Sequence, residues 1–215
     1  MDFKLKIPGH DIVFAGSARH QVAITGRTSN AQTLKPLNGA RVEIISSPTA
    51  FAAKVQLLQA LAGAQWETMV ERLDRTRTRA AGYFYFLDLP PGLYTLKASL
   101  PGAGSRYGET QVNATVVHDA AGNITKATAN LALPATTLKG TVVDAGSEPV
   151  ILAEARIVGS GEYDFTNENG EYLLASLEKG ARTVQVSARG FQTATQAALL
   201  SAAGSQVTLN FNLVP

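Results

Sequence analysis

Apolar and polar residues alternate with a period of two along several segments of this chain, a pattern typical of β-strands with one buried face. The pattern is clearest over residues 137–144, 181–188 and 206–213. Between them, the segment Asn-Glu-Asn-Gly at 167–170 contains residues that readily adopt the positive φ of a tight hairpin. We therefore predict short strands whose apolar side chains face one core: Val184, Val186, Val207, Leu209, Phe211 and Leu213.

The chain contains an internal repeat. Glycines spaced ten residues apart occur twice, as Gly82, Gly92 and Gly102 and again as Gly170, Gly180 and Gly190. Such self-similarity indicates one structural unit used twice. The offset between the copies is 115 if Ala40 pairs with Ala155, but 88 where Thr78 pairs with Thr166. The first copy is therefore predicted to hold 27 extra residues between Ala40 and Thr78.

The extra segment changes its hydrophobic period from two to about 3.6, the period of a helix. Apolar residues recur every three or four positions from Phe51 to Leu73 and form one stripe. Ser47 is the expected N-cap, with Pro48 in the first turn. Gly63 is expected to divide the segment into two helices, because glycine disfavours a helix interior.

Three further apolar residues, Leu57, Leu61 and Val70, broaden this stripe. Most of the stripe is expected to pack on its own sandwich. Because the apolar face is wider than a narrow seam, part of it is also suited to contact a neighbouring subunit. The three broadening residues are the candidates for that contact.

These patterns predict an all-β protein of two tandem domains, the first with a helical insertion, and the resemblance described below implies that each domain is a Greek-key β-sandwich. A chain of 215 residues is long enough for two domains of about 100 residues, each with its own core. The expected organisation is an N-terminal extension at 1–20, a first sandwich at 21–133 with its insertion at about 47–74, a linker at 134–136 and a second sandwich at 137–215.

Composition argues against several classes of function. A net charge of +2 is a weak electrostatic footprint, so nucleic acid is not an expected partner. No run approaches the roughly 20 apolar residues of a membrane-spanning helix, so a membrane is not expected either. The absence of cysteine, together with a first segment that alternates apolar and charged residues, favours the cytoplasm over export. Only 17% of the residues are charged, which is below the usual quarter, and such a composition favours a surface that is partly covered by partners.

No catalytic or cofactor-binding constellation is found. His10, His20 and His118 lie far apart, and neither a nucleophile elbow nor a phosphate-binding loop is present. The oxygen-bearing residues of the 164–171 hairpin are better explained as turn chemistry than as a calcium site. We therefore expect no enzyme activity, no metal and no cofactor.

One basic cluster stands out, made of Arg72, Arg75, Arg77 and Arg79. On a strand, the last three would share one face. Such a row is suited to dock an acidic protein surface. A solvated edge strand that is protected by charge is the competing interpretation, and both remain open.

The second copy resembles the carboxypeptidase regulatory-like domain. The resemblance is carried by Gly140-Thr-Val-Val-Asp144, Ala155-Arg-Ile-Val158, Asn169-Gly-Glu-Tyr172 and Thr183-Val-Gln-Val-Ser187, with Gly180 and Gly190-Phe191 at the turns. It covers residues 137–213, and residues 21–133 fit it once the insertion is set aside. The resemblance implies a seven-stranded transthyretin-like sandwich and, because such domains are mostly attachments or packing modules, a non-catalytic role.

A second resemblance involves the first copy. The segments 74–78, 82–92 and 100–107 look like small proteins associated with phage-tail-like contractile injection systems. This resemblance implies a cap- or tail-associated structural protein that contacts sheath, tube or cap subunits, or further copies of itself, in a particle assembled in the cytoplasm.

The alternative function is a ligand-binding module that grips carbohydrate through exposed aromatics. Candidates are Tyr83, Tyr85, Tyr94, Tyr107 and Tyr163. Alternation places Tyr83 and Tyr85 on one face and Phe84 and Phe86 on the other, so one pair is expected to be exposed.

Overall fold

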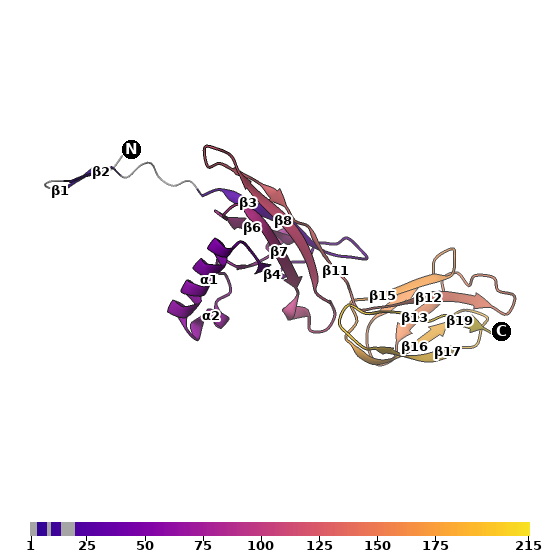
Figure 1. Cartoon of the computed structure of the whole chain (residues 1–215). Helices are drawn as coiled ribbons and strands as arrows, with labels where there is room; N and C mark the ends of the chain where they lie inside the picture. The colour runs from indigo at the N-terminus through magenta and orange to yellow at the C-terminus, as the bar shows by residue number, and fades with distance from the viewer. Residues whose placement is uncertain (1–3, 8–9, 14–19) are drawn as a thin grey trace.

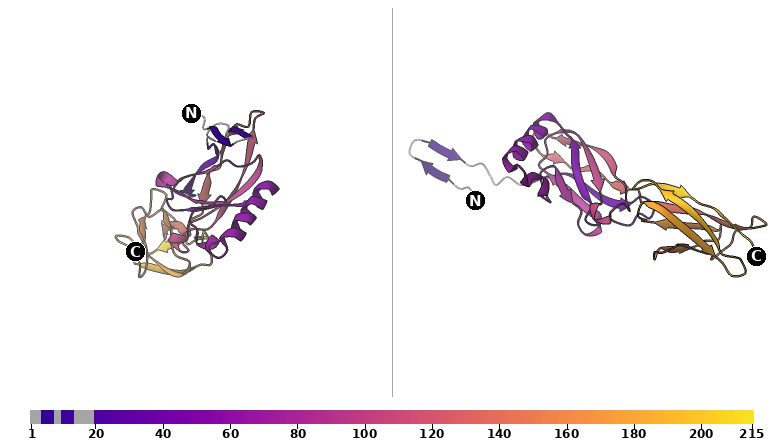
Figure 2. Two further views of the ribbon diagram at one scale, coloured as in Figure 1. Left: turned by 90° about the vertical axis from the view of Figure 1, so that its left-hand side faces the viewer. Right: turned by 90° about the horizontal axis from the view of Figure 1, so that it is seen from below.

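The computed structural model of the protein describes residues 4–7, 10–13 and 20–215, with side chains from residue 20 onward. Two β-sandwiches lie end to end, and two helices flank the first (Figures 1 and 2). The predicted all-β class with a helical insertion is confirmed. No helix in the described residues is both long and apolar enough to cross a membrane.

The first sandwich consists of two sheets. In one sheet, β3 (Val22–Asn30) pairs with β6 on one side and with β10 and β11 on the other. The second sheet has the order β5-β4-β7-β8-β9. The bounds of these partner strands are β4 (Arg41–Ser46), β5 (Arg75–Arg77), β6 (Tyr83–Leu87), β7 (Gly92–Ser99), β8 (Thr110–His118), β9 (Ile124–Thr125), β10 (Ala127–Thr128) and β11 (Leu131–Leu133).

The second sandwich repeats this topology without the additional strand β9. In one sheet, β12 (Thr137–Asp144) pairs with β15 and with the short parallel strands β18 and β19. The other sheet has the order β14-β13-β16-β17. Their bounds are β13 (Glu154–Ile157), β14 (Tyr163–Phe165), β15 (Glu171–Ala175), β16 (Gly180–Ser187), β17 (Ala194–Leu200), β18 (Gln206–Thr208) and β19 (Phe211–Leu213).

Each sandwich has its own apolar core between its sheets. Inward-facing residues alternate with exposed ones along the strands, as the period of two predicts. Of the six core residues predicted in the second sandwich, Val184, Val186, Phe211 and Leu213 are buried, while Val207 and Leu209 are partly buried against them.

Matching backbone details confirm the repeat. Gly26 lies against the carbonyl oxygen of Ala129, which interrupts the last strand of the first sandwich between β10 and β11. Gly140 lies in the same way against the carbonyl oxygen of Leu209, between β18 and β19. At each interruption an asparagine side chain, Asn130 or Asn210, accepts a hydrogen bond from the amide that follows the glycine, at 3.1 and 3.0 Å. The same local structure is therefore built twice.

Buried threonines revise the length of the insertion. The hydroxyl of Thr78 accepts from the amide of Ala40 at 2.9 Å, and that of Thr166 accepts from the amide of Ala153 at 2.8 Å. Ala40 thus corresponds to Ala153 and not to Ala155. The offset before the insertion is 113, against 88 after it, so the insertion has 25 residues rather than the predicted 27.

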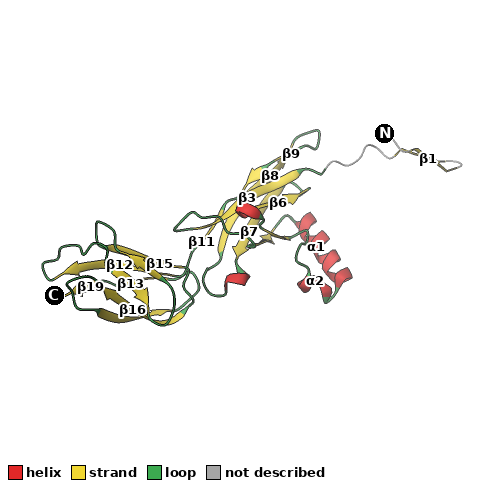
Figure 3. Ribbon diagram, turned by 180° about the vertical axis from the view of Figure 1, so that it is seen from behind, coloured by secondary structure: helices red, strands yellow, loops and turns green. Residues whose placement is uncertain are grey.

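The insertion replaces one turn of the fold. In the second sandwich, β13 and β14 are joined by residues 158–162, whereas in the first sandwich α1 (Thr49–Ala62) and α2 (Gln65–Thr68) lie between β4 and β5. Both helices lie beside the first sandwich, in red in Figure 3. Gly63 ends α1 with φ of 54°, which confirms the predicted division. The predicted N-cap is wrong, because Pro48 and not Ser47 occupies the cap position and makes no side-chain cap.

The predicted N-terminal extension contains the antiparallel strands β1 (Lys4–Ile7) and β2 (His10–Val13). The rest of that extension up to residue 19, and the side chain of His10, lie outside the described residues.

Candidate protein-contact surface

Two buried arginines attach the insertion to the first sandwich. Glu43 on β4 lies opposite Arg75 on β5, and Arg75 Nε donates to Glu43 Oε1 at 2.7 Å. Arg75 Nη1 also donates to the carbonyl oxygen of Met69 at 3.3 Å. Arg72 binds both carboxylate oxygens of Asp74, at 2.9 and 3.0 Å. These contacts hold the segment after α2 against the edge of the sheet.

The same arginines fix the position of Trp66. The guanidinium carbon of Arg72 lies 4.6 Å from the centre of the buried Trp66 ring, and its Nη1 donates to the Trp66 carbonyl oxygen at 3.2 Å. The side chains of Arg72 and Arg75 are only 6% and 10% exposed. Cation–π contacts strengthen when they are removed from water, so this cluster rigidifies the insertion.

The predicted row of arginines is therefore wrong in part. Arg72 and Arg75 are turned inward by Glu43 and Asp74 and offer no surface. Arg77 and Arg79 are exposed, and Arg79 forms an ion pair with Glu71 at 3.3 Å. The strand β5 ends at Arg77, so the three residues from Arg75 to Arg79 do not share one exposed face.

Glu43 is absent from the sequence prediction. It is a single carboxylate between two buried apolar residues, Val42 and Ile44, and that position is the signal that marks it. A carboxylate within such a strand needs a cationic partner, and the partner lies on the next strand.

The apolar stripe of the insertion is divided between the core and the surface. Phe51 is buried, with its ring edge-on to Tyr94 at 5.8 Å, and Val55 packs against the same core. Leu57 and Leu61 on α1 are 61% and 75% exposed. Val70 is exposed as well, and so are Met69 and Leu73 at the end of the stripe. We call Leu57, Leu61 and Val70 the insertion surface.

The aromatic candidates separate in the same way. Tyr83 and Tyr85 are 58% and 50% exposed, while Phe84 and Phe86 are buried, so the prediction that one pair is exposed is confirmed. Tyr94 is buried, its hydroxyl donates to the Pro90 carbonyl oxygen at 2.8 Å, and burial raises its pKa to about 12. It is therefore a core residue and not a ligand contact.

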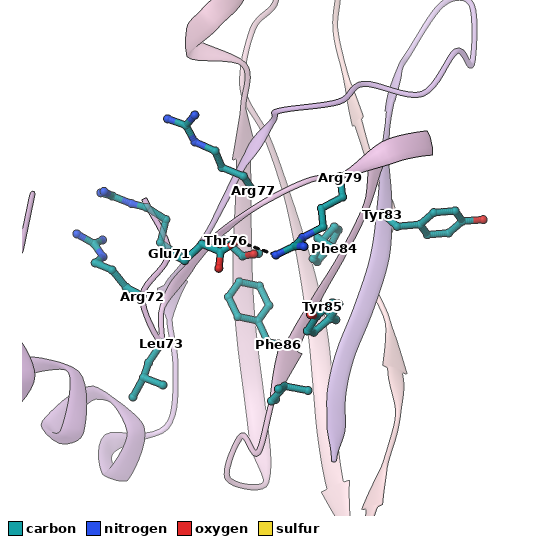
Figure 4. Close-up of a pocket in the computed structure, with 12 residues that line it drawn as sticks. Glu71, Arg72, Leu73, Thr76, Arg77, Arg79, Tyr83, Phe84, Tyr85 and Phe86 are labelled. Carbon is teal, nitrogen blue, oxygen red and sulfur yellow. Dashed lines mark hydrogen bonds and ion pairs between the residues drawn. The ribbon is translucent and has the colours of Figure 1, made fainter. Parts of the chain in front are cut away.

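A cavity of about 270 Å³ lies between β5 and β6 (Figure 4). Tyr83 and Tyr85 line it from β6, together with Thr76 and the two exposed arginines Arg77 and Arg79. Glu71 also lines the cavity, but the arginines outnumber it, so the lining has a net positive charge. One wall of the cavity is aromatic.

Loops of the two sandwiches are hydrogen-bonded to each other. Glu178 accepts from the Ser105 amide at 3.0 Å, from the Ser105 hydroxyl, and from Arg106 Nε at 3.0 Å. Tyr107 shares a hydrogen bond of 2.8 Å with the Ser176 hydroxyl. The buried Thr136, between the sandwiches, donates its amide to the Arg106 carbonyl oxygen at 2.9 Å. These bonds restrict the relative motion of the two sandwiches.

Acidification is expected to loosen this contact. The hydrogen bonds from Ser105 and Arg106 lower the pKa of Glu178 from 4.5 to about 2. Because the folded pKa is depressed, the stabilisation is present above about pH 4.5 and is lost as the pH falls through about 2. An NMR titration of the Glu178 carboxyl should show this pKa, and X-ray scattering should show looser sandwiches in the acid range. At neutral pH, Glu178→Gln should show the same loosened sandwiches as the wild type shows in acid. A Glu178 pKa at its ordinary value would contradict the prediction.

The hairpin considered for calcium is internally bonded. Asn167 Oδ1 accepts from the amides of Asn169 and Glu171, each at 2.9 Å, and Asp164 Oδ2 accepts from the Leu173 amide at 2.8 Å. In the described part of the chain, no group of three or more His, Asp or Glu residues is placed to hold a metal ion. The hydrogen bonds agree with the interpretation as turn chemistry.

Comparison with solved structures gives loose similarities. A type II Cohesin-X-Dockerin complex from Acetivibrio cellulolyticus shows 18% identity over 36% of this chain and 56% of that chain, with a TM-score of 0.31. The shaft pilin SpaA from Lactobacillus rhamnosus GG shows 14% identity over 91% of this chain and 96% of the pilin chain, with a TM-score of 0.37. The Bacillus anthracis TIE protein shows 16% identity over 90% of this chain and 34% of the TIE chain, with a TM-score of 0.35.

The chain thus spans about half the length of the cohesin–dockerin match. No curated protein matches the sequence. The second sandwich, over residues 137–214, matches the carboxypeptidase regulatory-like domain family.

Proposed function

We propose that this protein is a non-enzymatic structural protein that binds other proteins through the insertion surface of its first sandwich. The observation that carries this proposal is the exposure of Leu57 and Leu61 on an insertion that buried arginines hold rigidly. Large apolar side chains are costly to leave in water, and a rigid segment loses little entropy on binding. The second sandwich has a short turn at the same place.

The more specific proposal concerns the partner. We place the protein as a cap- or tail-associated component of a phage-tail-like contractile injection system, assembled in the cytoplasm, with sheath, tube or cap subunits or further copies of itself as partners. Its support is the sequence resemblance of the segments 74–78, 82–92 and 100–107. Two of these segments border the insertion and the cavity between β5 and β6.

Electron microscopy of particles from a deletion strain tests this proposal. Particles without the protein should show altered length, sheath or capping, and the wild-type gene should restore them. A double variant, Leu57→Asp with Leu61→Asp, should fail to restore them, although its changes lie on the surface and should alter stability by no more than about 0.5 kcal/mol each.

The matched control is the double variant Gln56→Asp with Gln59→Asp, which places the same two negative charges at other exposed positions of α1. It should restore normal particles. Normal particles in the deletion strain would refute the particle proposal. Rescue by the variant with Leu57→Asp and Leu61→Asp would refute the role of the insertion surface alone.

A second candidate function is carbohydrate binding. It is favoured by a groove of about 700 Å³ on the second sandwich, lined by the exposed Phe165 and by polar side chains such as Asp164, Asn167 and Asn210. Phe165 stacks edge-on with the exposed Tyr163 at 5.8 Å. A glycan array should show binding that Phe165→Ala removes, and an array without binding would contradict this function.

A further inference from the structure

The strand β6 forms one edge of its sheet, and its backbone orientation can be determined from its neighbour. Tyr85 lies opposite Thr25 on β3, and the Thr25 carbonyl oxygen accepts from Ala129 at 2.8 Å on the other side of β3. In an antiparallel pair, the N–H and C=O groups of two opposite residues either bond to each other or all point away from the partner strand. The N–H and C=O of Tyr85 therefore point away from β3, toward the open edge.

Tyr83 has the same orientation, because it lies two residues earlier on the strand. Its carbonyl oxygen accepts from the Arg79 amide at 2.9 Å, on the side away from β3. The amides of Tyr83 and Tyr85 thus face the cavity side of β6, and neither is used in the pairing with β3.

In the second sandwich, side chains cap the two equivalent amides. The Leu173 amide, which corresponds to Tyr85, donates to Asp164 Oδ2 at 2.8 Å. The Glu171 amide, which corresponds to Tyr83, donates to Asn167 Oδ1 at 2.9 Å. Capping by polar side chains protects a sheet edge against pairing with another strand.

The first sandwich has lost both caps. At the offset of 88, Asp164 corresponds to Thr76 and Asn167 to Arg79. A guanidinium has no acceptor, so Arg79 cannot cap an amide. Among the described residues, no side chain or loop carbonyl accepts from the amides of Tyr83 or Tyr85. One of two otherwise equivalent edges is therefore open.

The open edge borders the cavity between β5 and β6, which is positively charged (Figure 4). Arg77 has no ion pair within the described part of the chain. The ion pair between Arg79 and Glu71 is largely exposed, so it is readily exchanged for another carboxylate. Pairing two copies through this edge would bring two positive rims together, which disfavours a second copy as the occupant.

We propose that the edge of β6 binds an extended segment of a partner protein that carries acidic side chains, and that this segment adds to the sheet as a further strand. Backbone bonds to the Tyr83 amide and to the amide and carbonyl groups of Tyr85 would supply affinity. The two arginines would select acidic residues at alternate positions. This site is separate from the insertion surface, so the two proposals stand or fall independently.

The test uses the full chain and a synthetic peptide of about eight residues that alternates valine and glutamate. Fluorescence anisotropy should detect its binding at or below about 1 mM, and a peptide with lysine for glutamate should bind at least about tenfold more weakly. By hydrogen exchange, the Tyr85 amide should exchange faster than the Leu173 amide and should slow when the acidic peptide is added.

Thr76→Asp restores the lost cap and should weaken peptide binding at least about tenfold. The control Thr125→Asp adds the same charge on β9, at the opposite edge of the five-stranded sheet, and should leave binding unchanged. The proposal is overturned if no peptide binds, if both peptides bind equally, or if both variants weaken binding equally. Exchange of Tyr85 as slow as that of Leu173 in the free wild-type protein also overturns it, and this measurement needs no variant.

Discussion

Replacement of Gly26 by alanine should destabilise the first sandwich by about 3 kcal/mol, the upper end of the usual cost of overpacking. A Cβ at this position would lie 1.8 Å from the carbonyl oxygen of Ala129 and 2.7 Å from the ring of Phe84. The oxygen belongs to the backbone that joins β10 to β11, and both strands pair with β3. Relief of the clash requires β3 to separate from its partner, so no rotamer change removes it.

Urea unfolding followed by tryptophan fluorescence measures this effect, because the single tryptophan, Trp66, lies in the first sandwich. Gly102→Ala is the matched control. A Cβ there meets nothing within 4 Å, and the change should stay within about 0.5 kcal/mol. A Gly26→Ala variant that unfolds at the same urea concentration as the wild type would show that the strands separate at little cost.

The repeat could be predicted from sequence because glycine spacing records backbone requirements directly. Gly82 and Gly170 both adopt positive φ, of 77° and 72°, and a Cβ at either would lie about 2.5 Å from a carbonyl oxygen. Residues with a side chain are excluded from these two positions, so both copies have glycine there. Alanine fits many positions, so sequence alone does not distinguish Ala155 from Ala153 as the equivalent of Ala40. The hydroxyl hydrogen bonds of the buried threonines identify Ala153.

The division of the arginines could not be predicted from periodicity. A period of two says which side chains share a face of a strand, but it does not say what covers that face. Arg75 is buried because the register of β4 and β5 places Glu43 opposite it, 32 positions earlier in the chain. Alignment of the two copies did contain the signal for the open edge, since the offset of 88 pairs Thr76 with Asp164.

Replacement of Glu43 by glutamine should destabilise the first sandwich by about 3 kcal/mol, because it removes the nearest counter-charge of a buried guanidinium. The other carboxylate near Arg75, that of Glu67, lies 3.8 Å away and is 72% exposed, so it compensates only weakly. Arg75 Nε lies 2.7 Å from Glu43 Oε1, and Arg72 Nη2 lies 3.9 Å from the same oxygen. Glutamine keeps the shape of the side chain and one acceptor, so the loss reports the charge. Urea unfolding with Trp66 fluorescence measures it, because Arg72 stacks on that ring.

Glu71→Gln is the matched control for this loss. Glu71 also pairs with an arginine, Arg79, at 3.3 Å, but both side chains are more than half exposed. Water and salt screen such a pair, so its removal should cost less than about 1 kcal/mol. If the two substitutions lower the free energy of unfolding by the same amount, the burial of Glu43 does not strengthen its ion pair with Arg75. A large difference means that the charge of Glu43, and not merely its contacts, holds the insertion in place, and Leu57 and Leu61 are then presented from a fixed support.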